Sequence, residues 1–171
     1  MLTVDIATTW DGQPADKAEQ CAVHLCHLSA DLLSLRVDAP WHGDPPPPTP
    51  PGPTRHLWEY EVVELFVAGP GSAYTEIELS PHGHSLVLQL EGVRQVKAEL
   101  NAKGYVAHIL GGRWSGQLLL PRAWLPAGPH RVNATAIHGV GPARRYLSAV
   151  PLPGDRPDFH QPAAWPALEL G

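Results

Sequence analysis

Sulfur is scarce in this chain of 171 residues, which contains two cysteines and one methionine. Cys21 and Cys26 lie five positions apart in the segment CAVHLCH, so on one strand their side chains point to opposite faces. Two such thiols cannot easily form a disulfide, which requires side chains that approach each other. The sequence therefore predicts free thiols, and a core formed without disulfide bonds.

Basic clusters and long hydrophobic runs are also lacking. The net charge is −5, and the arginines are scattered apart from the pair Arg144 and Arg145, so no basic surface for nucleic acid is indicated. The first twelve residues, MLTVDIATTWDG, have neither the basic start nor the apolar core of a signal peptide, and no run approaches the length of a membrane span. We therefore expect a cytoplasmic protein with neither nucleic acid nor a membrane as a partner.

Proline and glycine, in contrast, are abundant, with 20 and 16 residues. Proline breaks helix interiors and glycine weakens them, which argues against a mainly helical protein. Short alternating segments between the proline-rich stretches predict an all-β protein, a sandwich of two antiparallel sheets in a single domain over residues 1–171. The ten predicted strands cover residues 2–6, 22–28, 32–37, 61–68, 75–80, 85–90, 105–110, 116–120, 131–138 and 146–150.

Three other segments have a distinct composition. Residues 14–20 and 121–125 are the candidates for helix, and both are short. In residues 44–53, DPPPPTPPGP, eight of ten positions are proline or glycine, so we predict a loop outside the sheets. This loop is either a stiff polyproline ligand for a partner or an insertion tolerated between two strands, and the common length variation of surface loops favours the second interpretation.

The segment from 57 to 84, LWEYEVVELFVAGPGSAYTEIELSPHGH, places carboxylates at unusual strand positions. Because side chains alternate along a strand, Tyr74, Glu76 and Glu78 share one face. Glu64 shares its face with apolar neighbours. Burying a carboxylate alone costs several kcal/mol or forces it to take up a proton, so Glu64 is expected to be hydrogen-bonded, paired with a cation or bound to a ligand.

Two interpretations of these acidic residues remain open at this point. Glu76 and Glu78 could line a solvated face of an antiparallel sheet, where charged side chains are common. Alternatively, they belong to a binding site together with Trp58, Tyr60 and Glu61, since an aromatic ring beside fixed acceptors is typical of a site for a polar ligand. The proximity of the aromatic residues favours a site.

Two groups of residues have side chains that can bind metal ions. Histidines His82, His84, His138 and His160 are candidates for a transition metal, but no spacing signature fixes a third ligand. The oxygens of Glu61, Glu76 and Glu78 would suit a hard cation, although no EF-hand loop is present. We therefore expect that no cofactor is required and keep a structural calcium ion as an alternative.

The sequence offers few signs of catalysis. Glu64 with Glu76 or Glu78 would form an acid–base pair of the glycosidase kind. The nucleophile elbow G-x-S-x-G, the phosphate-binding P-loop and the dinucleotide fingerprint are all missing from the sequence. A small cytosolic enzyme is therefore the alternative to a binding protein.

Longer motifs resemble a known family. Trp58 with the strand VVELF, followed by YTEIELSPHG, RVNATAIHG, RRYLSAVP and PDFHQPAAW in this order, is similar to the family-nine carbohydrate-binding-module-like proteins of the DOMON-like superfamily. The resemblance covers residues 58–168, and the first fifty residues more loosely. It extends to a bacterial branch of small proteins that consist of this domain alone.

The resemblance implies a jelly-roll-like or immunoglobulin-like sandwich with a slot where two aromatic rings grip the end of a saccharide. Trp58 matches one ring and Trp165 the second, whereas Glu64 and Glu78 match acidic acceptors for hydroxyl groups. With Glu76 from the same strand face, the expected ligand-binding residues are Trp58, Glu64, Glu76, Glu78 and Trp165. Unlike the secreted members, this chain shows neither a signal peptide nor an attached hydrolase.

The resemblance and the chemistry of sugars lead to the same expectation. A pyranose stacks its apolar face on tryptophan, and a hydrogen bond from a hydroxyl to a carboxylate contributes roughly 1.5–3 kcal/mol. We therefore expect a non-catalytic protein that binds a small saccharide. Other members of the superfamily bind haem, but Met1 cannot serve as an axial ligand, so that alternative would require two histidines and ranks below sugar.

Overall fold

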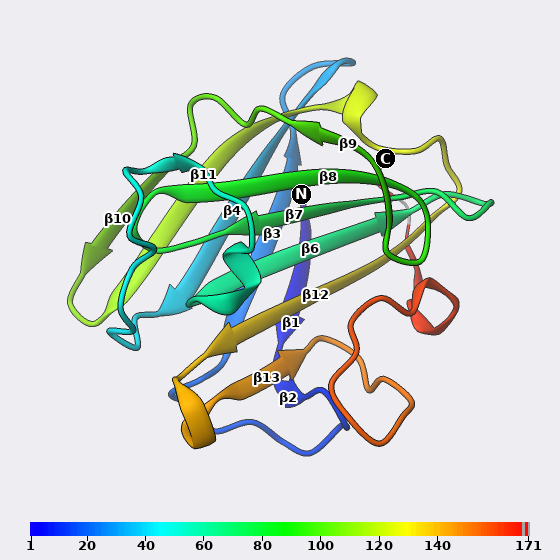
Figure 1. Ribbon diagram of the computed structural model, residues 1–171. Coiled ribbons are helices and arrows are strands. Elements are labelled where there is room, and N and C mark those ends of the chain that lie inside the picture. Colours follow the sequence, from blue (N-terminus) through cyan, green and yellow to red (C-terminus); the bar gives the residue numbers. More distant parts are fainter. Residues whose placement is uncertain (169, 171) are drawn as a thin grey trace.

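The computed structural model describes residues 1–168 and 170. Two sheets pack face to face in a β-sandwich, as predicted from the sequence (Figure 1). The smaller sheet has the strand order β1-β3-β4-β11-β10, and the larger has the order β2-β13-β12-β6-β7-β8-β5, with β14 beside β12 and β9 beside β8. In the described part of the chain the helices are single 3-10 turns, and none is long enough to cross a membrane.

The elements of the smaller sheet are β1 (Leu2–Ile6), β3 (Cys21–His27), β4 (Leu32–Pro40), β10 (Val106–Leu110) and β11 (Arg113–Pro121). Those of the larger sheet are β2 (Thr8–Thr9), β5 (Gly52–Pro53), β6 (Val62–Ala68), β7 (Tyr74–Leu79), β8 (His84–Gly92), β9 (Gln95–Leu100), β12 (His130–His138), β13 (Arg145–Ser148) and β14 (Ala167–Leu168). The 3-10 turns are η1 (Leu57–Glu59), η2 (Arg122–Trp124), η3 (Gly141–Ala143) and η4 (Pro162–Ala164).

Alternation along the strands builds the main core between the two sheets. On β6, Val63, Leu65 and Val67 point inward and pack with Leu35 and Leu118 from the facing sheet. Sheets packed in this way place apolar side chains of both inner faces in a common layer. The inner layer is therefore an ordinary sandwich core.

The outer face of the larger sheet is also covered, which is less usual for an antiparallel sheet. Phe66 and Tyr74 lie on this face and pack under Phe159 and Trp165 of the C-terminal segment, residues 152–165. Every residue of β6 and β7 is consequently buried. The interpretation that the acidic residues of β7 line a solvated face is therefore wrong.

The ten predicted strands are all present, with ends that differ by up to three residues. The structure corrects two other predictions. Residues 14–20 form turns rather than a helix, because Pro14 is held in a bridge to Thr8. The proline-rich loop is not wholly outside the sheets, since Gly52–Pro53 pairs in parallel with His84 and Ser85 at the sheet edge, where a proline is tolerated because its missing N–H faces away from the ladder.

The cysteines agree with the sequence analysis. Cys21 and Cys26 are both free thiols on β3, the first buried in the core and the second half-buried. Burial raises the pKa of the Cys21 thiol to about 12. This thiol is therefore un-ionised and unreactive at neutral pH.

Candidate functional site

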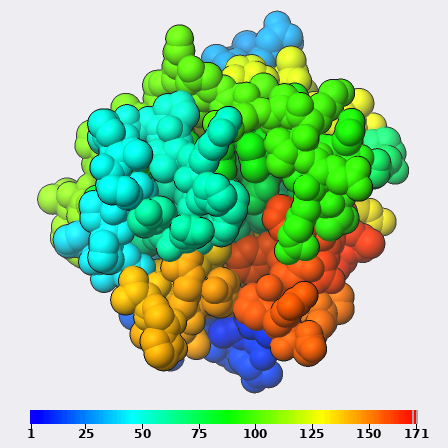
Figure 2. All heavy atoms as spheres, viewed as in Figure 1, coloured from blue at the N-terminus to red at the C-terminus, as the bar shows by residue number. Residues whose placement is uncertain are grey.

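The outer face of the larger sheet carries a cleft of about 340 Å³. It lies among η1, the turn between β8 and β9, and residues 157–160, which meet around a hollow in the middle of the face seen in Figure 2. Its apolar lining includes Trp58, Phe66, Leu88, Leu90, Tyr146 and Phe159. Its polar lining consists of Glu64, Glu76, Arg94, Asp158 and His160.

Three glutamates gather at the inner end of the cleft. Glu64 on β6 lies directly opposite Glu78 on β7, and Phe66 lies opposite Glu76. Because residues two apart on a strand share a face, all three carboxylates point to the same side of the sheet. One oxygen from each lies within 4.8 Å of the others. Like charges opposite each other destabilise a sheet, so strand pairing alone does not account for this arrangement.

Burial raises the pKa of the two glutamates that line the cleft. Loss of water raises the pKa of Glu64 to about 7, although the Thr135 hydroxyl donates a hydrogen bond to it and the charge of Arg144 also lowers the value. For Glu76, burial and then the charge of Glu64 raise the pKa well above its usual range, while Arg94 opposes them. Near neutral pH the pair therefore holds at least part of its protons.

Glu78 is the most isolated of the three. Its side chain is 0% exposed, and neither oxygen has a hydrogen-bond partner among the residues that the structure describes. Burial, followed by the charges of Glu64 and Glu76, raises its pKa well above the usual range. The nearby backbone N–H of Trp58 acts in the opposite direction and lowers the pKa, but its geometry falls outside that of a hydrogen bond. A buried polar group without a partner is uncommon and suggests a role outside the fold.

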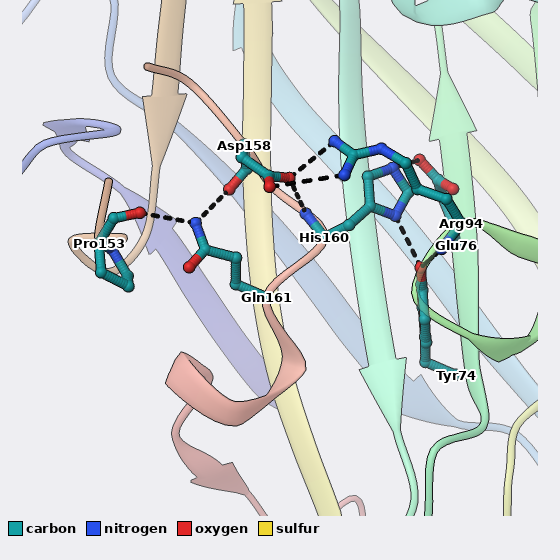
Figure 3. Close-up of polar contacts among 7 residues, drawn as sticks. All are labelled: Tyr74, Glu76, Arg94, Pro153, Asp158, His160 and Gln161. Carbon is teal, nitrogen blue, oxygen red and sulfur yellow. Dashed lines mark hydrogen bonds and ion pairs between the residues drawn. The ribbon is translucent and has the colours of Figure 1, made fainter. Parts of the chain in front are cut away.

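An ion pair closes one side of the cleft (Figure 3). The Arg94 guanidinium donates to Asp158 over 2.8 and 3.5 Å, and the backbone N–H of His160 donates to the same carboxylate over 3.1 Å. Arg94 adopts a left-handed conformation with φ of 57°, which costs a residue with a side chain roughly 1–2 kcal/mol. From this turn the guanidinium reaches Asp158 in the C-terminal segment.

The polar network continues from the rim to the floor of the cleft. The Tyr74 phenol oxygen accepts the backbone N–H of Arg94 over 3.1 Å and lies 2.7 Å from Nδ1 of His160 (Figure 3). Burial, and next the charge of Arg94, lowers the pKa of His160 to about 4, so the imidazole is neutral at pH 7. We assign the phenol as the donor to Nδ1, which places the ring proton on Nε2, 3.8 Å from Glu76.

Trp58 forms the opposite wall. It belongs to η1. The residue before this turn, His56, has a left-handed conformation with φ of 58°. The Trp58 carbonyl accepts a hydrogen bond from Arg144, whose guanidinium also lies 5.8 Å from the centre of the Tyr146 ring. The Trp58 side chain remains 40% exposed, so its ring is accessible to a ligand.

No family model matches the chain. The UPF0462 protein C4orf33 homolog of Danio rerio is 37% identical over 165 residues, which cover 91% of this chain and 83% of that protein. The UPF0462 protein C4orf33 of Homo sapiens is 35% identical over 164 residues, which cover 91% of this chain and 81% of that protein. The chain belongs to the UPF0462 family.

A solved structure has the same fold as this UPF0462 chain. It is the crystal structure of a candidate carbohydrate-binding protein from Bacteroides uniformis, with a TM-score of 0.72 over 96% of this chain and 84% of that one. The two sequences are 16% identical. At this identity the likeness establishes the common fold alone.

The structure brings four of the five predicted ligand-binding residues of this UPF0462 chain together. Trp58, Glu64 and Glu76 line the cleft, and Glu78 lies beside them. It does not bring Trp165 there. That ring is 0% exposed and packs against Phe66 and Tyr74, with ring centres 5.2 and 5.6 Å apart. The prediction that Trp165 is the second ring of the binding slot is therefore wrong, because this side chain anchors the C-terminal segment to the sheet. Phe159 and Tyr146 supply the other aromatic surfaces of the cleft.

Other predicted ligands lie elsewhere. Glu61 accepts the backbone N–H groups of His42 and Asp44 and so holds the start of the proline-rich loop. The candidate histidines are dispersed: His84 contacts the Thr49 carbonyl, and His138 contacts Glu19. Among the described residues, the carboxylates close enough to share a metal are Glu64, Glu76 and Glu78.

Sequence reasoning did not place Arg94, Asp158 and His160 at the rim of this site, and it considered His160 only as a candidate ligand for a transition metal. An acid and a histidine two positions apart in PDFHQ, a segment with few other charges, were the available signal. The partner of Asp158 is 64 residues away in the chain, so its position depended on the fold.

Proposed function

We propose that the cleft binds the end of a small saccharide without altering it chemically. The observation that carries this proposal is the placement of the accessible Trp58 ring and the two carboxylates Glu64 and Glu76 on the walls and floor of one cleft. A sugar ring needs such a combination, because it has an apolar face for stacking and a rim of hydroxyl groups for carboxylate acceptors.

Further support comes from the fold and from the motifs. The structural neighbour from Bacteroides uniformis is a candidate carbohydrate-binding protein and shares the sandwich. The motifs around Trp58 and Tyr74–Leu79 resemble family-nine carbohydrate-binding-module-like proteins, and we include membership of the DOMON-like superfamily in the proposal. The haem alternative loses support, because His160 is the one histidine lining the cleft in the described part of the chain.

One observation favours glycoside hydrolysis as a second candidate. Oxygens of Glu64 and Glu76 lie within 4.8 Å of each other, and retaining glycosidases hold their two carboxyl groups about 5–5.5 Å apart. Such an enzyme needs one ionised and one protonated carboxyl group, and burial here raises the pKa of both. Release of nitrophenol from a panel of aryl glycosides, at a rate abolished by Glu76→Gln, would replace binding with hydrolysis as the function.

Binding itself is tested by calorimetric titration of mono- and disaccharides. We expect at least one sugar to bind with a dissociation constant in the millimolar to micromolar range, roughly −4 to −8 kcal/mol. The absence of measurable binding of the wild-type protein to any sugar in a broad panel would overturn the proposal.

A pair of tryptophan variants locates the binding site. Trp58→Ala should weaken binding roughly 2- to 10-fold, as expected from the loss of a stacking contact of about 0.5–1.5 kcal/mol. Trp41→Ala is the matched control, because Trp41 is also 40% exposed but lies outside the cleft. Equal effects of the two substitutions would contradict a site at Trp58.

A further inference from the structure

The three glutamates at the inner end of the cleft have no cationic partner among the arginines nearby. The two guanidinium groups whose charges influence them are engaged elsewhere: Arg94 pairs with Asp158, and Arg144 donates to the backbone carbonyls of Trp58 and Glu59. Neither forms a hydrogen bond with the glutamates in the described structure. The fold therefore gathers three buried carboxylates without supplying a cation of its own.

The hydrogen bonds of the glutamates point to the same conclusion. Glu64 accepts one hydrogen bond, from Thr135, and Glu76 has the Nε2 of His160 at 3.8 Å. Glu78 is 0% exposed, neither of its oxygens has a hydrogen-bond partner in the described residues, and it faces the other two carboxylates. Leaving such a group unpaired costs the full desolvation of a charge or the uptake of a proton. A ligand that approaches from Glu64 and Glu76 would reach it.

The geometry fits a metal ion. Because the three oxygens lie within 4.8 Å of one another, some point lies no more than about 2.8 Å from all three, and calcium–oxygen distances are about 2.3–2.6 Å. Small side-chain rotations would close the difference. Three carboxylates offer up to six oxygens, and the open cleft above Glu64 and Glu76 leaves room for water molecules to complete the coordination.

We propose that Glu64, Glu76 and Glu78 bind a divalent cation of the calcium class at the inner end of the cleft. The all-oxygen ligand set selects a hard cation over zinc, which prefers nitrogen and sulfur. Calcium is favoured over magnesium, because it accepts irregular and bidentate carboxylate coordination, whereas magnesium requires a near-ideal octahedron and retains its water.

The experiment uses the metal alone and the full chain. Chelator-treated wild-type protein is titrated with Ca²⁺, Mg²⁺ and Zn²⁺ by calorimetry, and we expect Ca²⁺ to bind with a stoichiometry of one and more tightly than the other two. Terbium luminescence excited through tryptophan gives a second readout, with Ca²⁺ displacing Tb³⁺. Absence of both calcium binding and terbium binding at millimolar concentrations, or a preference for Zn²⁺, overturns the proposal.

Variants assign the site. Glu78→Gln keeps the shape of the side chain, and we expect it to weaken Ca²⁺ binding at least about 100-fold, the upper range for outer-shell changes at metal sites. Glu99→Gln is the matched control, because Glu99 lies on β9 of the same sheet and pairs with Arg55 at the surface. Calcium should raise the thermal midpoint of the wild type and of Glu99→Gln, and not that of Glu78→Gln. Unchanged calcium affinity in folded Glu78→Gln overturns the assignment.

The cation site does not depend on the proposed saccharide. If the protein binds calcium but none of the sugars tested, this inference is supported and the proposed function is overturned. Saccharide binding in a protein that binds no cation would do the reverse. The two proposals are therefore decided by separate titrations of the same sample.

Discussion

Arg94 and Asp158 join the turn after β8 to the C-terminal segment across the edge of the cleft, with a closest contact of 2.8 Å. Both side chains are partly exposed, so the pair contributes little to global stability, typically 0.2–1 kcal/mol. Its consequence is local, because the same Asp158 carboxylate also accepts the backbone N–H of His160. The pair fixes the wall of the cleft rather than the fold.

Asp158→Asn should therefore lower the free energy of unfolding by no more than about 1 kcal/mol in urea titrations. It should increase amide hydrogen exchange in residues 157–160, because the segment loses its charged anchor. Asp38→Asn is the control, since Asp38 and Arg113 form a comparably exposed pair on the smaller sheet. Equal exchange of residues 157–160 in both variants would contradict the local role.

Glu64→Gln should leave the thermal midpoint unchanged or raise it. The substitution removes a buried charge without stranding a cation, and the amide oxygen can still accept from Thr135. Three arginines that could have paired with Glu64 have other partners: Arg94 contacts Asp158, Arg113 contacts Asp38, and Arg131 contacts the Trp165 carbonyl.

The same variant should bind saccharide roughly 5- to 10-fold more weakly in calorimetry, because a neutral acceptor makes a weaker hydrogen bond than a charged one. Glu91→Gln, at an exposed position near the end of β8, provides the control for the loss of one negative charge. A midpoint lowered by several degrees with intact binding would assign Glu64 to the fold.

Trp165→Ala should lower the free energy of unfolding by about 3–5 kcal/mol, as expected when a fully buried aromatic residue is truncated. Trp165→Phe should cost less, since it keeps an aromatic ring and the indole Nε1 has no hydrogen-bond partner in the described structure. Urea titrations of both variants measure the difference. A loss below 1 kcal/mol for Trp165→Ala would contradict its role as the anchor of the C-terminal segment.

Glu19 should make the protein acid-sensitive. Two hydrogen bonds from Arg145, of 2.7 and 2.9 Å, are the main reason why the pKa of Glu19 falls from 4.5 to about 2. A carboxyl group with a depressed folded-state pKa stabilises the protein above its unfolded pKa, and this contribution is lost as the pH falls through the folded value. The stability difference between wild type and Glu19→Gln should therefore be largest above pH 4.5 and shrink toward pH 2 in urea titrations. A difference independent of pH would contradict this assignment.

Alternation along the chain was sufficient to predict the sandwich and the shared face of Tyr74, Glu76 and Glu78. The same alternation predicts that Glu64 points away from the core, on the face of β6 opposite to Val63 and Leu65. The position of Glu64 opposite Glu78 followed from the antiparallel pairing of two consecutive strands. The local pattern and the short connection between β6 and β7 were therefore sufficient to predict that Glu64, Glu76 and Glu78 share one face.

The rest depended on contacts between distant parts of the chain. The burial of Glu76 and Glu78 required a cover over the outer sheet face, and strand periodicity does not indicate what covers a strand. The burial of Trp165 depends on the same cover, because its ring packs on Phe66 and Tyr74, about a hundred residues earlier. The pairing of Gly52–Pro53 with β8 was hidden by a composition that usually excludes strands.

The cover formed by residues 152–165 has a consequence for the order of events during synthesis. All strands except β14, and all three glutamates, precede residue 152, yet the cleft needs Asp158, Phe159 and His160. A nascent chain that has folded only its strands would expose the apolar outer face around Phe66 and Tyr74. The proposed binding cleft is therefore completed only when this C-terminal segment packs on the sheet, and the same packing protects that face from aggregation.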